Sequence, residues 1–285
     1  MTSLTLINGD SSDMSQLGPS SVHLVVTSPP YPMIEMWDPL FASLDATSFD
    51  SMHEYLKKTW QECYRTLVPG GICCINIGDA ARRIEDEFML YTNHVRITEI
   101  CQSLGFHSLP YILWKKPTNK PNAFLGSGFL PPNAYVTIDC EFILIFRKGN
   151  LRRFPTKDAI RKESIYTKYE RDIWFSQIWD DIKGAKQCGN NEMERRTAAF
   201  PYEVPYRLIR MFSCVTDTVL DPFCGTGTTL KAASDLGRNA IGYELDTDLI
   251  EVVKEKLRSN DHGATEGREF HILYQGDQKE SPHHI

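Results

Sequence analysis

The feature that most restricts the fold of this chain is an alternation of strand and helix patterns between residues 218 and 257. Its parts are a short apolar strand (218–220), a glycine-rich loop (Asp221-Pro-Phe-Cys-Gly-Thr-Gly-Thr-Thr229), a helix (228–236), a second strand (240–244) and a second helix (248–257). Such alternation is typical of a parallel sheet covered by helices. The sequence therefore predicts a doubly wound α/β fold.

The glycine-rich loop predicts a ligand site at the turn between the first strand and its helix. Gly225 and Gly227 allow a ligand to approach the backbone. The loop lacks the lysine of a phosphate-binding loop, and Leu230 occupies the position of the third glycine in the dinucleotide fingerprint. We therefore expect a nucleoside ligand with a short charged end, whose ribose hydroxyls donate hydrogen bonds to Glu244.

A second stretch with chemical content is Val22–Tyr31, in which the apolar run Leu24-Val25-Val26 predicts a buried strand that ends at Ser28-Pro29-Pro30-Tyr31. The prolines fix the backbone, so that a hydroxyl, a carbonyl and an aromatic face are held toward the same small space. This arrangement predicts a pocket for a flat polar group, although a proline-rich turn after a strand would look the same. Asp79 follows the strand at 72–77, where its carboxylate either reaches the same sheet edge or caps a helix beginning at Ala80.

The remaining patterns complete the sheet and its helices. We expect strands at 4–7, 111–114, 141–146 and 270–274, helices at 49–67, 95–104 and 204–212, a short helical connection at 11–17, an irregular loop at 32–38 and a long loop at 119–133. The strand at 4–7 and the strand that contains Leu24-Val25-Val26 are expected to be parallel neighbours. Only one of the strands at 4–7 and 270–274 can be the third strand of the ligand-binding half.

Composition limits the class of protein. A chain of 285 residues that is 41% apolar can bury the core of one large α/β domain with an insertion. Its eight cysteines include no Cys-x-x-Cys pair, so neither a metal site nor disulfides are expected. We therefore expect the protein to be cytoplasmic. The sequence shows no secretion signal and no stretch long and apolar enough to span a membrane.

The net charge of −6 argues against a nucleic-acid partner, but the charge is unevenly distributed. Residues 147–171 hold nine Lys or Arg against three acids, and aromatic residues accompany them. Such a segment suits contact with DNA, and it is equally compatible with a solvated helix face.

Together, Ser-Pro-Pro-Tyr and Asp-Pro-Phe-Cys-Gly-Thr-Gly-Thr-Thr resemble the two signature motifs of amino-group DNA methyltransferases. Phe200-Pro201 resembles the family segment that packs on the methionine end of the cofactor. Because the catalytic motif precedes the cofactor motif, the chain is most similar to the permuted β group, in which the third strand opens the chain. The resemblance implies a Rossmann-like class I S-adenosylmethionine-dependent methyltransferase sheet with permuted motif order, comprising a catalytic half (1–149), a target-recognition insertion (150–195) and a cofactor-binding half (196–285).

The resemblance also implies roles for individual residues. The cofactor S-adenosyl-L-methionine would be held by Asp10, Phe200, Asp221, Pro222, Phe223, Cys224, Gly225, Thr226, Gly227, Thr228 and Glu244. Asp10 would contact the adenine amino group, a role for which Asp277 is the alternative. Catalysis would use Ser28, Pro29, Pro30, Tyr31 and Asp79, and no metal is expected.

In the family, Ser-Pro-Pro-Tyr accompanies mainly methylation of cytosine N4, and the run from Thr27 to Asp38 looks like cytosine-N4 enzymes of restriction–modification systems. The expected reaction is therefore N4 methylation of a flipped cytosine in duplex DNA. Ser28 and the Pro29 carbonyl would accept hydrogen bonds from the amine, Tyr31 would stack on the base, and Asp79 or water would take a proton.

Alternatives are adenine N6 methylation, methylation of RNA or protein, and a non-catalytic DNA-binding regulator that retains the cofactor site. A cognate restriction endonuclease and a homodimer are compatible with the resemblance but not specified by it. The target sequence cannot be deduced from these residues.

Overall fold

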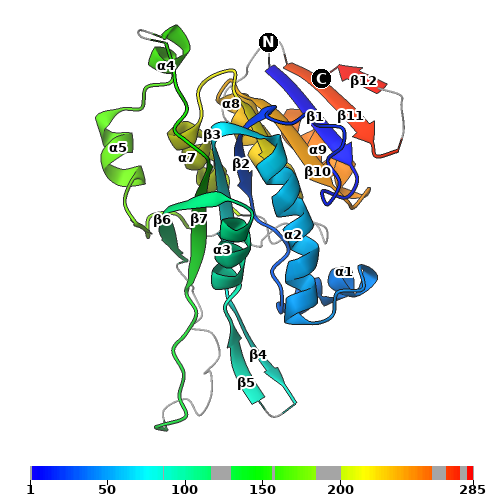
Figure 1. The fold of residues 1–285 in the computed structure, drawn as a ribbon, viewed down its shortest axis with the longest axis vertical. Helices are drawn as coiled ribbons and strands as arrows, with labels where there is room; N and C mark the ends of the chain where they lie inside the picture. The colour runs from blue at the N-terminus through cyan, green and yellow to red at the C-terminus, as the bar shows by residue number, and fades with distance from the viewer. Residues whose placement is uncertain are drawn as a thin grey trace.

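The computed structural model describes residues 2–85, 87–116, 130–155, 158–183, 200–258, 268–276 and 281–284. Within these ranges, ten strands form one sheet in the order β12-β11-β1-β10-β9-β2-β3-β7-β6-β8 (Figure 1). The strands are β1 (Thr2–Asn8), β2 (Val22–Thr27), β3 (Leu67–Ile77), β6 (Phe106–Lys115), β7 (Cys140–Lys148), β8 (Ile178–Trp179), β9 (Thr218–Asp221), β10 (Asn239–Glu244), β11 (Arg268–Tyr274) and β12 (Ser281–His284). The run from β11 to β3 is parallel throughout, which confirms the predicted α/β fold.

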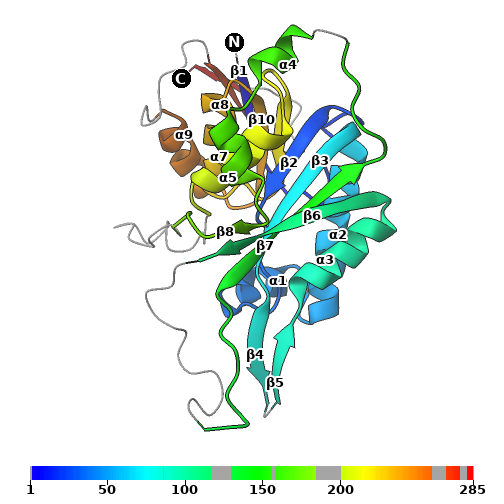
Figure 2. The same ribbon diagram turned by 90° about the vertical axis from the view of Figure 1, so that its left-hand side faces the viewer.

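Helices cover both faces of this sheet (Figure 2). One face carries α2 (Phe49–Thr66) and α3 (Asn93–Ser103), and the other carries α7 (Glu203–Phe212), α8 (Thr228–Asp235) and α9 (Leu249–Arg258). Neighbouring strand residues point to opposite faces, so Val25 packs with the α2 side and Val26 with the α7 side. In the described part of the chain, no helix is long and apolar enough to cross a membrane.

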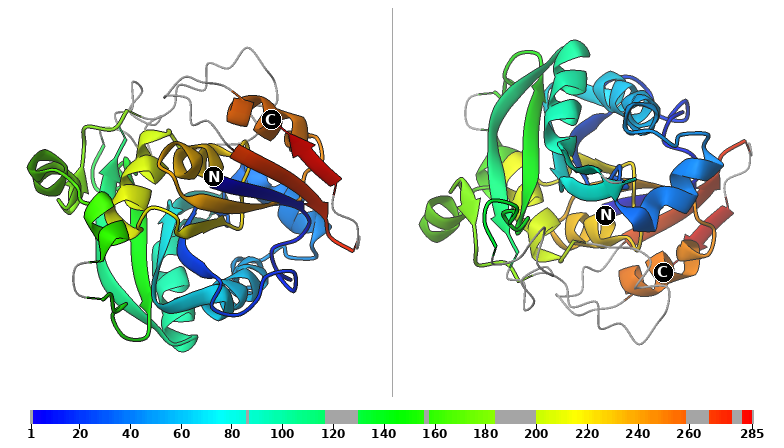
Figure 3. Two further views of the ribbon diagram at one scale, coloured as in Figure 1. Left: turned by 90° about the horizontal axis from the view of Figure 1, so that it is seen from above. Right: turned by 90° about the horizontal axis from the view of Figure 1, so that it is seen from below.

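The opening strand β1 belongs to the half of the sheet built by the end of the chain. It lies between β10 and β11 (Figure 3), and Leu4 is in register with both Ala240 and Phe270. This confirms the permuted order, because β1 occupies the third-strand position beside β10 and β11 lies outside it. The expectation that β1 and β2 are neighbours was wrong, since β10 and β9 lie between them.

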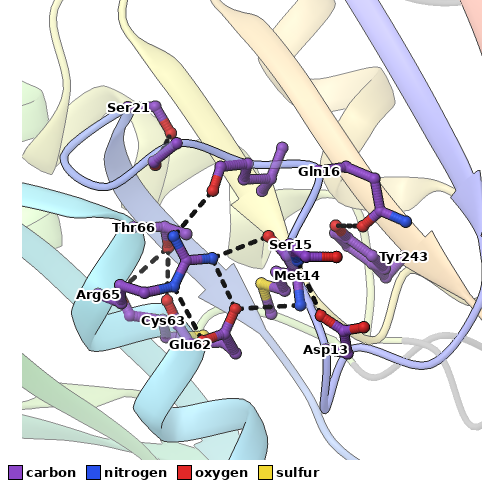
Figure 4. Close-up of polar contacts among 12 residues, drawn as sticks. Asp13, Met14, Ser15, Gln16, Ser21, Glu62, Cys63, Arg65, Thr66 and Tyr243 are labelled. Atoms are coloured by element: carbon purple, nitrogen blue, oxygen red, sulfur yellow. Dashed lines mark hydrogen bonds and ion pairs between the residues drawn. The ribbon is translucent and has the colours of Figure 1, made fainter.

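The predicted helical connection at 11–17 was also wrong, because these residues form turns. The guanidinium of Arg65 on α2 donates to the carbonyl oxygens of Met14 and Leu17, each at 2.8 Å (Figure 4). The carboxylate of Glu62 accepts from the Met14 N–H at 3.0 Å. Side chains of α2 thus form hydrogen bonds with backbone groups of Met14 and Leu17 that would otherwise be paired within a local helix.

Two further expectations differ from the structure. Part of the supposed irregular loop at 32–38 is a 3₁₀ turn (Glu35–Trp37), and α1 (Asp38–Ser43) follows it. No helix begins at Ala80, because β4 (Ala80–Ile84) pairs with β5 (Glu87–Tyr91) in a hairpin that projects from the body (Figure 1). The loop expected at 119–133 lies mostly outside the described residues.

The chain between the end of β7 and strand β8, which contains most of the basic segment (147–171), runs from one edge of the sheet to the other. Because β7 runs antiparallel to β3, Arg147 pairs with Ile72, near the edge where the parallel strands begin. Two short helices follow, α4 (Ala159–Glu163) and α5 (Lys168–Trp174). Strand β8 then pairs Trp179 with Trp114, close to the edge where the parallel strands end (Figure 2).

Candidate active site

A cavity of about 1090 Å³ lies at the edge where the parallel strands end, as expected for open α/β sheets. Predicted site residues that line it are Asp10, Ser28, Pro29, Pro30, Tyr31, Phe200, Asp221, Pro222, Phe223, Cys224, Gly225, Thr226, Thr228 and Glu244. Gly227 and Asp79 are not among the lining residues. The fold therefore brings the two motifs, which are nearly 200 residues apart in sequence, to one space.

The two glycines of the loop have different functions. Both have positive φ, +53° at Gly225 and +79° at Gly227, which favours glycine. A Cβ on Gly227 would lie 2.9 Å from a methyl carbon of Val253, so this glycine allows α9 to pack closely. A Cβ on Gly225 would meet nothing within 4 Å, because this position opens toward the cavity. Gly225 is thus the glycine that a ligand can approach.

A buried carboxylate, Asp221, and a half-buried one, Glu244, flank this loop. Asp221 accepts hydrogen bonds from the Thr27 hydroxyl at 2.7 Å and from the Phe223 N–H at 3.1 Å, and burial raises its pKa to about 6. Glu244 accepts from the Gly225 N–H at 2.7 Å and the Asp246 N–H at 2.8 Å, and burial raises its pKa to about 7. Glu244 therefore connects the end of β10 to the glycine loop, where it faces the cavity.

Asp10 is held in a fixed position at the end of β1. Its carboxylate accepts from the Tyr55 hydroxyl at 2.7 Å and from the Ser12 N–H at 2.8 Å. The side chain of Gln275 bonds to both the backbone N–H and the carbonyl of Asp10, which ties β1 to the end of β11. The alternative residue, Asp277, lies outside the described residues.

Lys256 was not predicted from the sequence. From α9 its ammonium group donates to the hydroxyls of Thr226 and Thr228 in the glycine loop. In sequence it is an ordinary solvent-facing helix residue, and only the packing of α9 on α8 brings it to the loop.

The Ser-Pro-Pro-Tyr motif forms a hydrogen-bond network at the other end of the cavity. The Tyr31 oxygen lies 3.1 Å from the Ser28 hydroxyl, 2.8 Å from the Asn76 amide nitrogen and 3.0 Å from Glu141 Oε2. Burial, with the charge of Glu141, raises the pKa of Tyr31 well above its ordinary value. A Cβ on Gly78 would come within 3.1 Å of the Tyr31 ring, so the absent side chain makes room for it.

Asn76 and Glu141 were also missed by the sequence analysis. Asn76 is a single polar residue in the buried run of β3, which is a signal that could have been noticed. Glu141 lies near the start of β7, where a charged residue looks like an ordinary strand boundary. Lys116 completes the group through an ion pair with Glu141.

Asp79 contacts α3 instead of the cavity. Its carboxylate accepts from the ring Nδ1 of His94 at 2.8 Å and from the His94 N–H at 3.2 Å. The His94 ring in turn stacks on Phe142, with ring centroids 3.8 Å apart. The structure therefore places Asp79 at the start of α3 and does not bring it to the other predicted catalytic residues.

Comparison with known proteins identifies relatives over nearly the whole chain. The model of the N6/N4 DNA methylase family matches residues 22–255. The chain is 56% identical over 279 residues to the type II methyltransferase M.MjaI of Methanocaldococcus jannaschii, covering 90% of this chain and 91% of that protein. It is 48% identical over 264 residues to M.MthZI of Methanothermobacter thermautotrophicus, covering 87% and 74%.

Solved structures agree with this assignment. A protein from Thermus thermophilus, provisionally named a DNA modification methylase and complexed with S-adenosyl-L-methionine, superimposes with a TM-score of 0.74 at 34% identity, covering 95% of this chain and 99% of that one. The cytosine-N4-specific PvuII DNA methyltransferase shares the fold, with a TM-score of 0.64 at 19% identity over 92% of this chain and 89% of that one.

The cavity fits that cofactor. Gly225 leaves open space for a ligand, Glu244 and Asp10 offer carboxylate oxygens, and the rings of Phe200 and Phe223 provide apolar walls. These groups suit an adenosine with a charged amino-acid tail. The chain is a DNA methyltransferase of the N6/N4 DNA methylase family, and its cofactor is S-adenosyl-L-methionine.

Proposed function

We propose that this protein methylates the N4 amine of a cytosine at a specific site in duplex DNA, and that it acts in the cytoplasm. The supporting observation is that Ser28-Pro29-Pro30-Tyr31 and the glycine loop line one cavity. The relatives named type II methyltransferases support a role in restriction and modification, in which the methyl group protects the site from a cognate nuclease.

We assign the cofactor end of the cavity as follows. Glu244 accepts the ribose hydroxyls, Asp10 accepts the adenine amino group, and Phe200 with Phe223 encloses the apolar surface of the ligand. When bound, S-adenosyl-L-methionine supplies an electrophilic methyl group on a positively charged sulfur. The chain contributes position and the exclusion of water.

At the other end of the cavity, the target amine is a poor nucleophile because its lone pair is delocalised into the ring. We assign the Ser28 hydroxyl and the Pro29 carbonyl as acceptors for its two hydrogens, which turns the lone pair out of the ring plane. The face of Tyr31 stacks on the extruded base. Asp79 holds His94 in this assignment, and water takes the proton that the amine releases.

DNA would approach the edge of the sheet on which the cavity opens. Within the proposed insertion at 150–195, strand β8 lies close to that edge. Exposed cations there include Lys115 at the end of β6 and Lys183 after β8. We therefore assign phosphate contacts to these residues, whereas the part of the segment near Arg152 lies at the opposite edge.

The test is mass spectrometry of nucleosides from duplex DNA treated with enzyme and labelled cofactor. Label in N4-methylcytosine supports the proposal. Label in N6-methyladenine would show that the target base is adenine and not cytosine. Label at cytosine C5 overturns the mechanism, because that reaction requires a nucleophile that attacks the ring. Ser28→Ala should lower the rate without weakening cofactor binding, and the exposed Ser15→Ala serves as the matched control.

A further inference from the structure

We propose that Glu141 is a positioning residue that sets the direction of the hydrogen bonds around Ser28, so that the Ser28 hydroxyl accepts a hydrogen bond from the target amine. The inference rests on the proposed function, since it requires an exocyclic amine in the cavity. It applies equally to a cytosine or an adenine amine.

The contacts of Glu141 are those of a fixed acceptor. The residue is 8% exposed and lines the cavity. Its Oε2 lies 3.0 Å from the Tyr31 oxygen and 2.7 Å from the Asn76 amide nitrogen, and its Oε1 is paired with Lys116. Three donors around one buried carboxylate hold it in place.

Counting protons then gives the direction of each hydrogen bond. An ionised carboxylate can only accept, and the amide nitrogen of Asn76 can only donate. The single proton of Tyr31 therefore goes to Glu141, and the Tyr31 oxygen is left as an acceptor. Ser28, at 3.1 Å, must donate its proton to that oxygen. The lone pairs of the Ser28 hydroxyl remain available on its other side.

This direction is the one that the reaction needs. An amine presents hydrogens, so Ser28 assists only as an acceptor. If Tyr31 donated to Ser28 instead, the Ser28 proton would be free to point at the amine, and two donors would face each other. Glu141 thus acts on the amine through Tyr31 and Ser28 without touching it.

The orientation of Asn76 supports this interpretation. Its side-chain oxygen is buried and has no hydrogen-bond partner among the described residues, which is an unfavourable arrangement. Turning the amide over would place that oxygen against the Tyr31 oxygen and Glu141 Oε2, which are both acceptors. In the observed orientation, the Asn76 amide group donates to both Tyr31 and Glu141, while its oxygen stays unpaired.

The test is a double-mutant cycle of Glu141→Gln and Tyr31→Phe, measured as kcat and KM on duplex DNA. The Gln amide can donate to the Tyr31 oxygen, so Glu141→Gln should lower kcat by roughly 10- to 100-fold, the effect of a hydrogen bond to a charged group, and leave both KM values unchanged. In the Tyr31→Phe background no hydroxyl links the two residues, and Glu141→Gln should have no further effect.

Thermal melting and cofactor calorimetry show whether each variant is folded, and the exposed Glu54→Gln is the matched control. Losses that multiply in the double variant, or a fall in kcat that accompanies loss of cofactor binding, overturn the role of Glu141. A wild-type enzyme that transfers no methyl group to DNA overturns the proposed function itself and, with it, this inference.

Discussion

The carboxylates of the cavity and those of the segment at 150–183, which includes most of the basic residues, have different kinds of hydrogen-bond partner. In the cavity, Asp221 and Glu244 are held by hydroxyl and backbone N–H groups, and burial raises both pKa values. Along the segment, acids are held by guanidinium groups. The hydrogen bond from Arg207 lowers the pKa of Asp181, and Arg210 binds Glu170 at 3.0 Å. The carboxylates of the cavity therefore have no guanidinium partner among these contacts and can interact with a ligand. The carboxylates of the segment form ion pairs that attach the segment to the body of the protein.

Position separates the two regions as well. Arg152, in the first part of the segment, lies at the edge opposite the cavity and makes a two-pronged ion pair with buried Asp217, at 2.6 and 2.8 Å. Trp174 and Trp179, two of the aromatic residues that follow the basic segment in sequence, are buried in the core. A count of positive and aromatic residues along the chain therefore does not show which of these side chains are free of contacts within the protein.

The largest effect that would sharpen this contrast is expected at Glu244. Glu244→Ala should weaken binding of S-adenosyl-L-methionine by about 1.5–3 kcal/mol, because a charged acceptor is lost. Isothermal calorimetry measures this directly. The exposed Glu251→Ala on α9 should bind normally, and unchanged affinity in Glu244→Ala would show that the ribose is held elsewhere.

The counterpart in the segment is Arg152. Arg152→Met should lower the free energy of unfolding by about 1–3 kcal/mol, because buried Asp217 loses its charged donor. Urea denaturation should show this loss while cofactor affinity stays unchanged. Its neighbour Arg153 is exposed, so Arg153→Met should leave stability unaltered. Weaker DNA binding by Arg152→Met with normal stability would contradict the contrast between the two regions.

The raised pKa of Glu244 predicts a pH dependence of stability in the absence of cofactor. The pKa is about 7 in the fold against an ordinary value of 4.5, so the folded state binds the proton more tightly than the unfolded chain does. This contribution to stability is complete below pH 4.5 and is lost as the pH rises through 7. Glu244→Gln should therefore gain stability relative to wild type between about pH 5 and pH 8. Urea unfolding curves whose difference does not change with pH would refute the burial of an ionisable Glu244.

The smallest effect concerns single surface cations. Neutralising one phosphate contact should reduce the salt dependence of DNA binding by about one unit of slope. Lys183→Gln, near the cavity edge, is expected to show this reduction. Lys162→Gln, on α4 near the opposite edge, should keep the wild-type slope. The reverse result would place the DNA along the first part of the basic segment.

Much of the fold followed from local patterns, because both motifs and the long strands are determined by nearby residues. The exceptions depend on residues far apart in sequence. The turns at 11–17 are imposed by Arg65, and the position of Arg152 follows from the antiparallel direction of β7. Within the site, Asn76 and Glu141 become recognisable only when β3 and β7 pair, since neither belongs to a motif.

The position of β1 has a consequence for how the chain folds as it is synthesised. Its two partners, β10 and β11, are more than 230 residues away, so β1 emerges long before either can pair with it. Closing such large loops is slow relative to forming local hairpins. Strands β2 and β3 and helix α2 can assemble first. The cofactor pocket forms only after β10 and β11 have paired with β1. A nascent chain of this protein therefore cannot bind its methyl donor until β10 and β11 have been made.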